Sequence, residues 1–123
     1  MDIQDRTFRF ACRIVALHQA LVKQDATERL LAGQLLRSGT SIGANLEEAT
    51  AGQSRADFIS KCSIALKEAR ETHYWLKLLE ATELMRSEEL AAVRGEAAEL
   101  VAILTTMVKN ARKNGERQMK IKN

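Results

Sequence analysis

The apolar residues near the end of the chain follow one spacing without a break, and this spacing constrains the fold more than any other feature. Between positions 90 and 111 they recur at alternating steps of three and four: Leu90, Val93, Ala97, Leu100, Leu104, Met107 and Ala111. The same alternation runs from position 58 to 79 through Phe58, Cys62, Ala65, Ala69, Thr72, Leu76 and Leu79. Such heptad spacing places each set on one face of an α-helix that packs lengthwise against others.

The composition favours helices along the whole chain. Its 123 residues include no proline, only 4% are aromatic, and the prevalence of Ala, Leu, Glu, Lys and Arg is typical of long helices. Apolar residues at helical steps predict a first helix over about 5–24. Asp25 and Glu28 fit a capping box that begins a second helix ending near Thr50. Four helices joined by short turns predict an all-α, antiparallel up-down-up-down bundle.

Charge and a helix-stop signal predict how the chain divides. Asn114-Gly115 is expected to end the last helix, which gives a four-helix bundle domain over 1–114 and a basic C-terminal tail over 115–123. Six basic residues and one acidic residue lie from Lys109 onward, whereas the whole chain has a formal net charge of +3. The positive charge therefore belongs to the C-terminal end, and the remainder is slightly acidic.

The second predicted helix contains small and polar residues that helices do not favour. Gly39 and Gly43 lie four residues apart, so they leave one patch without side chains and allow close packing of another helix. A polar set lies on one side of this helix, and we expect it to face two glutamates of the third helix: Ser38, Ser41, Asn45 and Glu48, with Glu68 and Glu71 opposite. Three interpretations stay open: a hydrogen-bonded network that fixes helix or subunit register, a groove for a ligand or partner, and a catalytic site.

Basic residues form the second candidate site. In an antiparallel bundle the fourth helix ends beside the start of the first, so the two groups are expected to meet: Arg6, Arg9 and Arg13 with Lys109, Arg112, Lys113, Arg117, Lys120 and Lys122. Positive charge concentrated at one end would suit the phosphates of RNA or DNA. The acidic remainder and the scarcity of exposed aromatic residues for base stacking argue against this use.

Recognisable catalytic and metal-binding motifs are absent from the sequence. A di-iron site in a bundle needs Glu-x-x-His pairs, but His73 lies two residues after Glu71 and five after Glu68. No phosphate loop occurs. Gly39-Thr40-Ser41-Ile42-Gly43 matches Gly-x-Ser-x-Gly in its letters, but it lies inside a predicted helix and not at the strand-to-helix turn that a nucleophile elbow needs. We therefore expect a non-enzymatic protein with no catalytic residues, metal or cofactor.

Cys12 and Cys62 lie among apolar neighbours and are expected to be buried free thiols, as in the reducing cytoplasm.

Three motifs resemble those of a known family: Ser41-Ile42-x-x-Asn45-Leu46-x-Glu48, Ser54-x-x-x-Phe58 and Ser63-Ile64-Ala65-Leu66. With them the chain is similar to the 23S rRNA intervening-sequence protein family of bacterial four-helix-bundle proteins, over about residues 29–79. The resemblance implies a left-handed bundle that assembles into a ring-like homopentamer, in a family whose biochemical role is mostly unknown. It also implies a distant relationship to the accessory protein of diversity-generating retroelements, a basic pentameric barrel that binds nucleic acid and a reverse transcriptase.

The sequence departs from the family pattern in two places. Gly52-Gln53 stands where the family often has paired arginines before the serine that matches Ser54. After Glu71, Thr72-His73-Tyr74-Trp75 replaces the usual polar continuation. Both departures weaken the transfer of a basic nucleic-acid surface from the middle of the family fold.

Two functions from different classes follow from these observations. The first is a homo-oligomeric ring, with five copies expected, that binds RNA or DNA through its basic end. The alternative is a protein–protein interaction or adaptor module with no nucleic-acid role, which would use the Ser41–Glu48 surface or the ring interface to bind another protein. Either protein is expected to be cytoplasmic and to have no contact with the membrane, because no apolar run approaches the roughly 20 residues that a membrane span needs.

Overall fold

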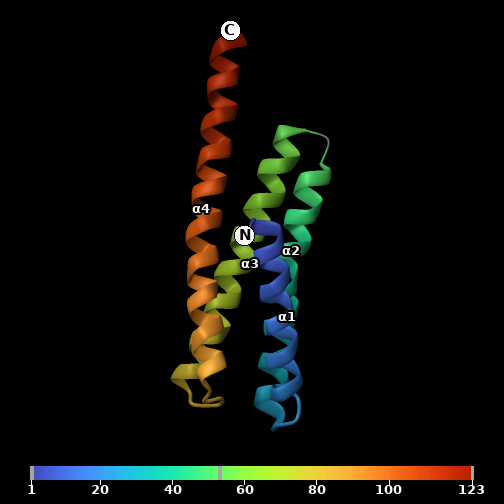
Figure 1. Cartoon of the computed structure of the whole chain (residues 1–123), viewed down its shortest axis with the longest axis vertical. Coiled ribbons are helices and arrows are strands. Elements are labelled where there is room, and N and C mark those ends of the chain that lie inside the picture. The colour runs from blue at the N-terminus through green and yellow to red at the C-terminus, as the bar shows by residue number, and fades with distance from the viewer. Residues whose placement is uncertain (1, 53, 123) are drawn as a thin grey trace.

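The computed structural model describes residues 2–52 and 54–122, with side chains as far as Gly115. Four helices account for nearly all of this part of the chain: α1 (Ile3–Leu21), α2 (Ala26–Ala51), α3 (Arg55–Ala81) and α4 (Glu88–Lys122). They run alternately up and down and pack side by side as an all-α four-helix bundle (Figure 1). The predicted fold class is therefore confirmed.

Short polar caps determine where each helix begins. The side chains of Asp2, Ser54 and Ser87 each accept a hydrogen bond from the backbone N–H three residues later. The predicted capping box at the start of α2 is present, with Asp25 and Glu28 each bonding the other's backbone N–H. These bonds satisfy N–H groups that the first turn of a helix leaves without partners.

The two heptad runs form the centre of the core. All members of the α3 run from Cys62 to Leu79 are fully buried, as are those of the α4 run from Leu90 to Leu104. Near the end of the α4 run Met107 is only half-buried, and Val108 lies in the core instead. An ideal helix drifts relative to a strict heptad, which accounts for this shift by one position.

The prediction that both cysteines are buried is correct for Cys62 and wrong for Cys12. Cys62 belongs to the core, and burial raises the pKa of its thiol. Cys12 is exposed because the buried face of α1 is formed by Phe10, Ile14 and Leu17. At about 100° per residue, Cys12 lies roughly opposite that face.

The fourth helix is longer than the sequence predicts. α4 continues through Asn114 and Gly115 to Lys122, whereas α1 has only 19 residues against the 35 of α4. Figure 1 shows α4 rising well beyond the N-terminal end of α1. One glycine costs a helix only about 1 kcal/mol, which does not by itself end it. The division into domain and tail at residue 114 stays a prediction.

Two glycines of α2 lie very close to side chains of α1. A Cβ atom built on Gly39 would lie 2.8 Å from Cγ1 and Cγ2 of Ile14, and one built on Gly43 would lie 3.2 Å from the Thr7 hydroxyl. Ile14 is fully buried and β-branched, so it has little room to move away. Glycine at position 39 is therefore required by packing and not by backbone conformation.

Replacing Gly39 by alanine should destabilise the bundle. Overpacking against Ile14 is expected to cost about 1–3 kcal/mol, which exceeds the helix preference of about 1 kcal/mol that alanine gains over glycine. Gly33→Ala is the matched control in the same helix, because a Cβ atom there meets nothing within 4 Å. Urea denaturation followed by circular dichroism should show a lower free energy of unfolding for Gly39→Ala and a higher one for Gly33→Ala. Equal stabilisation by both would contradict the close approach.

Candidate functional site

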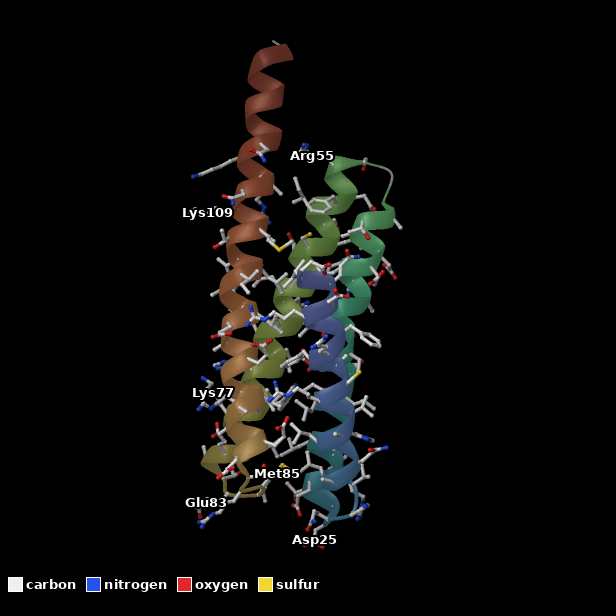
Figure 2. The ribbon with its side chains drawn as sticks, viewed as in Figure 1. Asp25, Arg55, Lys77, Glu83, Met85 and Lys109 are labelled. Carbon is white, nitrogen blue, oxygen red and sulfur yellow. The ribbon has the colours of Figure 1, made fainter. Side chains whose placement is uncertain are left out.

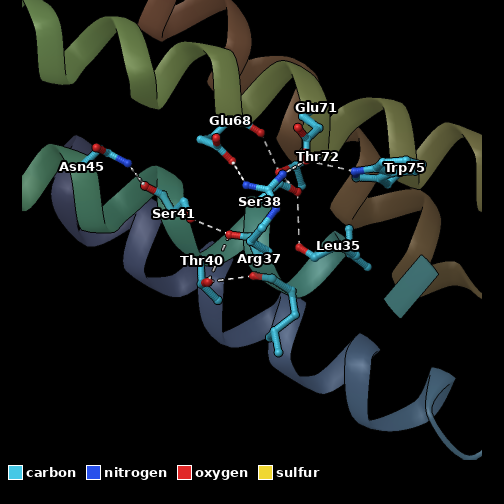
Figure 3. A network of polar contacts seen from close by, with 11 residues as sticks. Leu35, Arg37, Ser38, Thr40, Ser41, Asn45, Glu68, Glu71, Thr72 and Trp75 are labelled. Atoms are coloured by element: carbon cyan, nitrogen blue, oxygen red, sulfur yellow. Dashed lines mark hydrogen bonds and ion pairs between the residues drawn. The ribbon is translucent and has the colours of Figure 1, made fainter. Parts of the chain in front are cut away.

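A network of polar contacts joins α2 to α3 (Figure 3). The guanidinium of Arg37 donates to Glu68, at 3.1 Å, and to Glu71. Glu71 also accepts a hydrogen bond from the indole of Trp75, at 3.2 Å. Behind these groups, of which only Arg37 is exposed, the Thr72 hydroxyl lies 2.9 Å from the buried Ser38 hydroxyl. The arrangement links the two helices at a single level and fixes their register.

This network differs in membership from the predicted polar set. Ser38, Glu68 and Glu71 belong to it, but Ser41 and Asn45 donate only to backbone carbonyls four residues earlier in α2, at 2.5 and 2.8 Å. Serine and asparagine often satisfy themselves in this way within a helix. Glu48 instead pairs with Lys61 at 2.7 Å.

Three members of the network were absent from the predicted set, namely Arg37, Thr72 and Trp75. Arg37 and Trp75 contact it from the rims of α2 and α3, whereas Thr72 is a core residue that bonds across the interface. The sequence gives a weak signal for Arg37: it precedes Ser38, and two glutamates at positions 68 and 71 on one helix face repel each other, which a nearby cation relieves. Every buried side-chain polar atom in the described part of the chain has a hydrogen-bond partner.

The arginines of α1 do not meet the basic end of α4, so this expectation is wrong. Arg6 instead makes a double ion pair with Glu96, at 2.6 and 2.7 Å, and also contacts Glu99. Arg13 pairs with Glu89 at 2.8 Å. Since Arg6 lies level with Glu96, Lys109 is about 20 Å farther along α4. The greater length of α4 thus separates the two basic groups that the sequence was expected to bring together.

The surface around the α1 arginines has mixed charge. Arg6, Arg9 and Arg13 line a hollow together with Glu89 and Glu96. The guanidinium of Arg6 holds the pKa of Glu96 below its ordinary value, against the opposing effect of burial. The same contact raises the pKa of Arg6. Glutamates thus neutralise Arg6 and Arg13, and this surface is a poor candidate for binding phosphate.

The strongest candidate site is a hollow between α3 and α4, which we call the basic groove. It has a volume of about 710 Å³ and is lined by Ser63, Leu66, Lys67, Arg70, Thr105, Val108, Lys109, Arg112 and Lys113. Five of these residues are cations and none is acidic. None of the five forms an ion pair with a described side chain. Arg112 donates to the Ser63 hydroxyl at 3.4 Å, which links the two walls.

The predicted nucleic-acid contacts overlap the basic groove only in part. Lys109, Arg112 and Lys113 line it, but Lys67 and Arg70 of α3 were not predicted. The sequence does contain a signal for them, because polar residues at positions 63, 67, 70, 74 and 77 alternate by four and three along one face of α3. The side chains of Arg117, Lys120 and Lys122 lie outside the described residues.

A second hollow, the Tyr74 groove, continues the basic groove along the same two helices. It has a volume of about 360 Å³, and its lining consists of Arg70, His73, Tyr74, Lys77, Ala98 and Val101. Arg70 lines both grooves, so they form one continuous surface. Burial, with Lys77 and Arg94 nearby, lowers the pKa of His73 below its ordinary value of 6.5.

Metal-binding and membrane-spanning features are missing from the residues that the structure describes. Within them no three His, Cys, Asp or Glu side chains come together as a metal ion would need. No helix in the same part of the chain combines the length and the apolar character that crossing a membrane requires.

Comparison with known proteins connects this bundle to one family. A sequence model described as the 23S rRNA-intervening sequence protein matches residues 1–106. A crystal structure of a Bacteroides thetaiotaomicron VPI-5482 protein, described as of unknown function and from the S23 ribosomal protein family, is 45% identical. That likeness covers 88% of this chain and 99% of the other, with a TM-score of 0.79. No curated protein matches the chain.

Removing the charge of Arg6 should change how stability depends on pH. A Glu96 pKa that is lowered in the folded state stabilises the protein fully above the ordinary glutamate pKa, near 4.5, and this contribution is lost as the pH falls through the lower value. Arg6→Gln is therefore expected to reduce the free energy of unfolding at pH 7 by more than at about pH 3. Urea denaturation at both pH values would measure this difference.

The control for this measurement is Arg9→Gln, which makes the same charge change at an exposed position. The unfolding free energy of this control should differ little from that of the unmodified chain at either pH. A loss for Arg6→Gln that is equally large at both pH values would show that Arg6 stabilises α1 by packing and not through Glu96.

Proposed function

The chain belongs to the 23S rRNA-intervening sequence protein family, and we propose that it is a non-enzymatic protein that binds RNA or DNA through the basic groove. One observation carries the proposal: five cations, none of them ion-paired with a described side chain, line a single hollow between α3 and α4. The Bacteroides thetaiotaomicron relative offers no competing activity, since it is described as of unknown function.

The physical basis is the neutralisation of phosphate by lysine and arginine. Each phosphate that a cation neutralises releases a counterion from the nucleic acid, and this release favours binding at low salt. Arg70 and Arg112 can also bond a phosphate through two N–H groups at once. Contacts of this kind hold the backbone and do not read bases, so the groove supports binding with little sequence preference.

The pairing of charges elsewhere on the molecule supports the choice of this groove. Ion pairs with glutamates occupy Arg6, Arg13 and Arg37, whereas Lys67 and Lys109 have no acidic partner in the described structure. An unpaired cation attracts phosphate without first having to break an ion pair. The proposed interface is therefore on α3 and α4, and not at the start of α1.

We also propose that copies of the chain associate, with the pentameric ring that the family resemblance implies as the expected form. Support comes from an apolar patch on the outer side of α1, where Phe8 is 67% and Val15 39% exposed and Cys12 lies between them. Exposed apolar patches are typical of interaction sites. The basic groove is formed by other helices, so it stays open when α1 is covered.

Both cysteines are unpaired, which suits the cytoplasm as the place of action.

Charge reversal in the basic groove should weaken nucleic-acid binding. Lys67→Glu/Lys109→Glu is expected to lower the affinity for a labelled oligonucleotide about tenfold or more at low salt. If five cations each neutralise one phosphate of a single strand, log affinity should fall with log salt at a slope of about −3.5, and the double variant should lose about 1.4 of that slope. Fluorescence anisotropy at several salt concentrations would measure both quantities.

The matched control is Lys23→Glu/Arg29→Glu, which changes the charge equally but lies at the turn between α1 and α2, at the other end of the bundle. This control should retain most of the affinity. An equal loss for both variants would show that only overall charge matters and would contradict a localised site. Undetectable binding at low salt would contradict the nucleic-acid function and favour a protein partner.

Light scattering on the purified protein should give a mass several times that of the 13.7 kDa chain, with five copies expected. Phe8→Glu should shift the mass towards a single chain, because it places a charge in the apolar patch. Leu30→Glu is the control, since Leu30 is also exposed, at 75%, but lies on α2. A single-chain mass for the unmodified protein would contradict self-association, and dissociation by Leu30→Glu alone would place the contact elsewhere.

A further inference from the structure

We propose that the basic groove and the Tyr74 groove together hold one single strand of nucleic acid, with an unpaired base stacked on the ring of Tyr74. This inference rests on the proposed function and adds the class of ligand. It would make the protein selective for unpaired regions of RNA or DNA, although it reads no particular sequence.

The two grooves form one track along α3. Ser63, Lys67, Arg70, Tyr74 and Lys77 follow each other at alternating steps of four and three, which places them on the same face of the helix. From Ser63 to Lys77 this face extends about 21 Å. Lys77 and Lys109, from the two ends of the track, project on the same side of the molecule (Figure 2). A strand of a few nucleotides can therefore contact cations along its whole length.

The two ends of the track differ in chemistry. The lining of the basic groove includes five cations, which suit phosphates. The Tyr74 groove has a less polar wall formed by Ala98 and Val101, together with His73, whose pKa burial lowers. A base is flat and largely apolar on its faces, so it fits the second groove better than a phosphate does. Arg70 and Lys77 on either side of Tyr74 would hold the adjoining phosphates.

Tyr74 is placed to act as the stacking surface. It is 54% exposed, and among the other described aromatic residues only Phe8, on α1, is also exposed. Its ring is supported by Trp75, with the ring centroids 5.2 Å apart and the planes at 76°. Trp75 is held in turn by its hydrogen bond to Glu71, which also pairs with Arg37. This chain of contacts restricts Tyr74 before any ligand binds.

Stacking on Tyr74 requires a base whose face is free. In a duplex each base face is covered by the neighbouring base pairs, so a duplex can offer this track only its phosphates. A single strand offers phosphates and base faces together, and base–aromatic stacking contributes about 1–3 kcal/mol per base. The track should therefore bind a single strand more tightly than a duplex under the same salt conditions.

The test measures the affinity of the full chain for a uridine oligonucleotide, a deoxythymidine oligonucleotide and a duplex of the same length. The single strands are expected to bind about tenfold more tightly than the duplex. Tyr74→Ala should weaken single-strand binding about tenfold and leave duplex binding unchanged, whereas Tyr74→Phe should retain the affinity because it keeps the ring. Comparing the uridine and deoxythymidine strands would show whether RNA or DNA is preferred.

A second measurement reports on the site directly. Trp75 is the only tryptophan and packs against Tyr74, so its fluorescence should change when a single strand binds and should not change with a duplex. Circular dichroism of Tyr74→Ala would establish that the exposed substitution leaves the bundle folded. Leu30→Ala, at an exposed apolar position on α2, is the control and should bind like the unmodified chain.

The outcomes separate this inference from the proposed function. Equal affinity for single strands and duplex, with no effect of Tyr74→Ala, would overturn the stacking inference and leave the phosphate-binding function standing. A loss that Tyr74→Phe shares with Tyr74→Ala would also overturn it, because the ring would then not be the contact. An absence of binding to any of the three nucleic acids would overturn both.

Discussion

The register between α1 and α4 determines where charge is available on this molecule. The ion pairs from Arg6 to Glu96 and from Arg13 to Glu89 align the short first helix with the lower part of the long last one. Above the N-terminal end of α1, α4 has α3 beside it but not α1, and the last turns of α4 extend beyond α3 as well (Figure 1). The cations at positions 109, 112 and 113 therefore lie next to Lys67 and Arg70, and together they form the basic groove.

The sequence predicts the fold well because burial in a bundle follows a simple period. The runs from Cys62 to Leu79 and from Leu90 to Leu104 are buried as their spacing requires, and the caps mark helix starts to within a residue or two. The spacing of a heptad run depends only on the helix to which it belongs. Its buried face can therefore be predicted without knowing the neighbouring helices. The extended end of α4 was missed because a single glycine is a weak stop signal.

The candidate site was predicted less completely, because its composition depends on how the helices are aligned. The α1 arginines were expected near Lys109, but helix lengths that differ by many residues move contacts along the bundle axis, and heptad spacing does not fix this shift. Ser41 and Asn45 share a face with Ser38, yet short side chains can bond to their own helix as readily as across an interface. Which of these occurs is settled by the gap between helices, which the sequence does not specify.

The uneven pairing of charges also affects the rate at which the molecule meets a polyanion. A hollow lined by one sign of charge concentrates the electric field, so the face formed by α3 and α4 would be drawn towards phosphate from a distance and would orient the molecule before contact. Salt confines this attraction to about 8 Å at physiological ionic strength. The partly buried pair between Arg6 and Glu96 is screened much less than the exposed cations of the groove. Added salt would therefore slow the encounter while leaving the alignment of the helices intact.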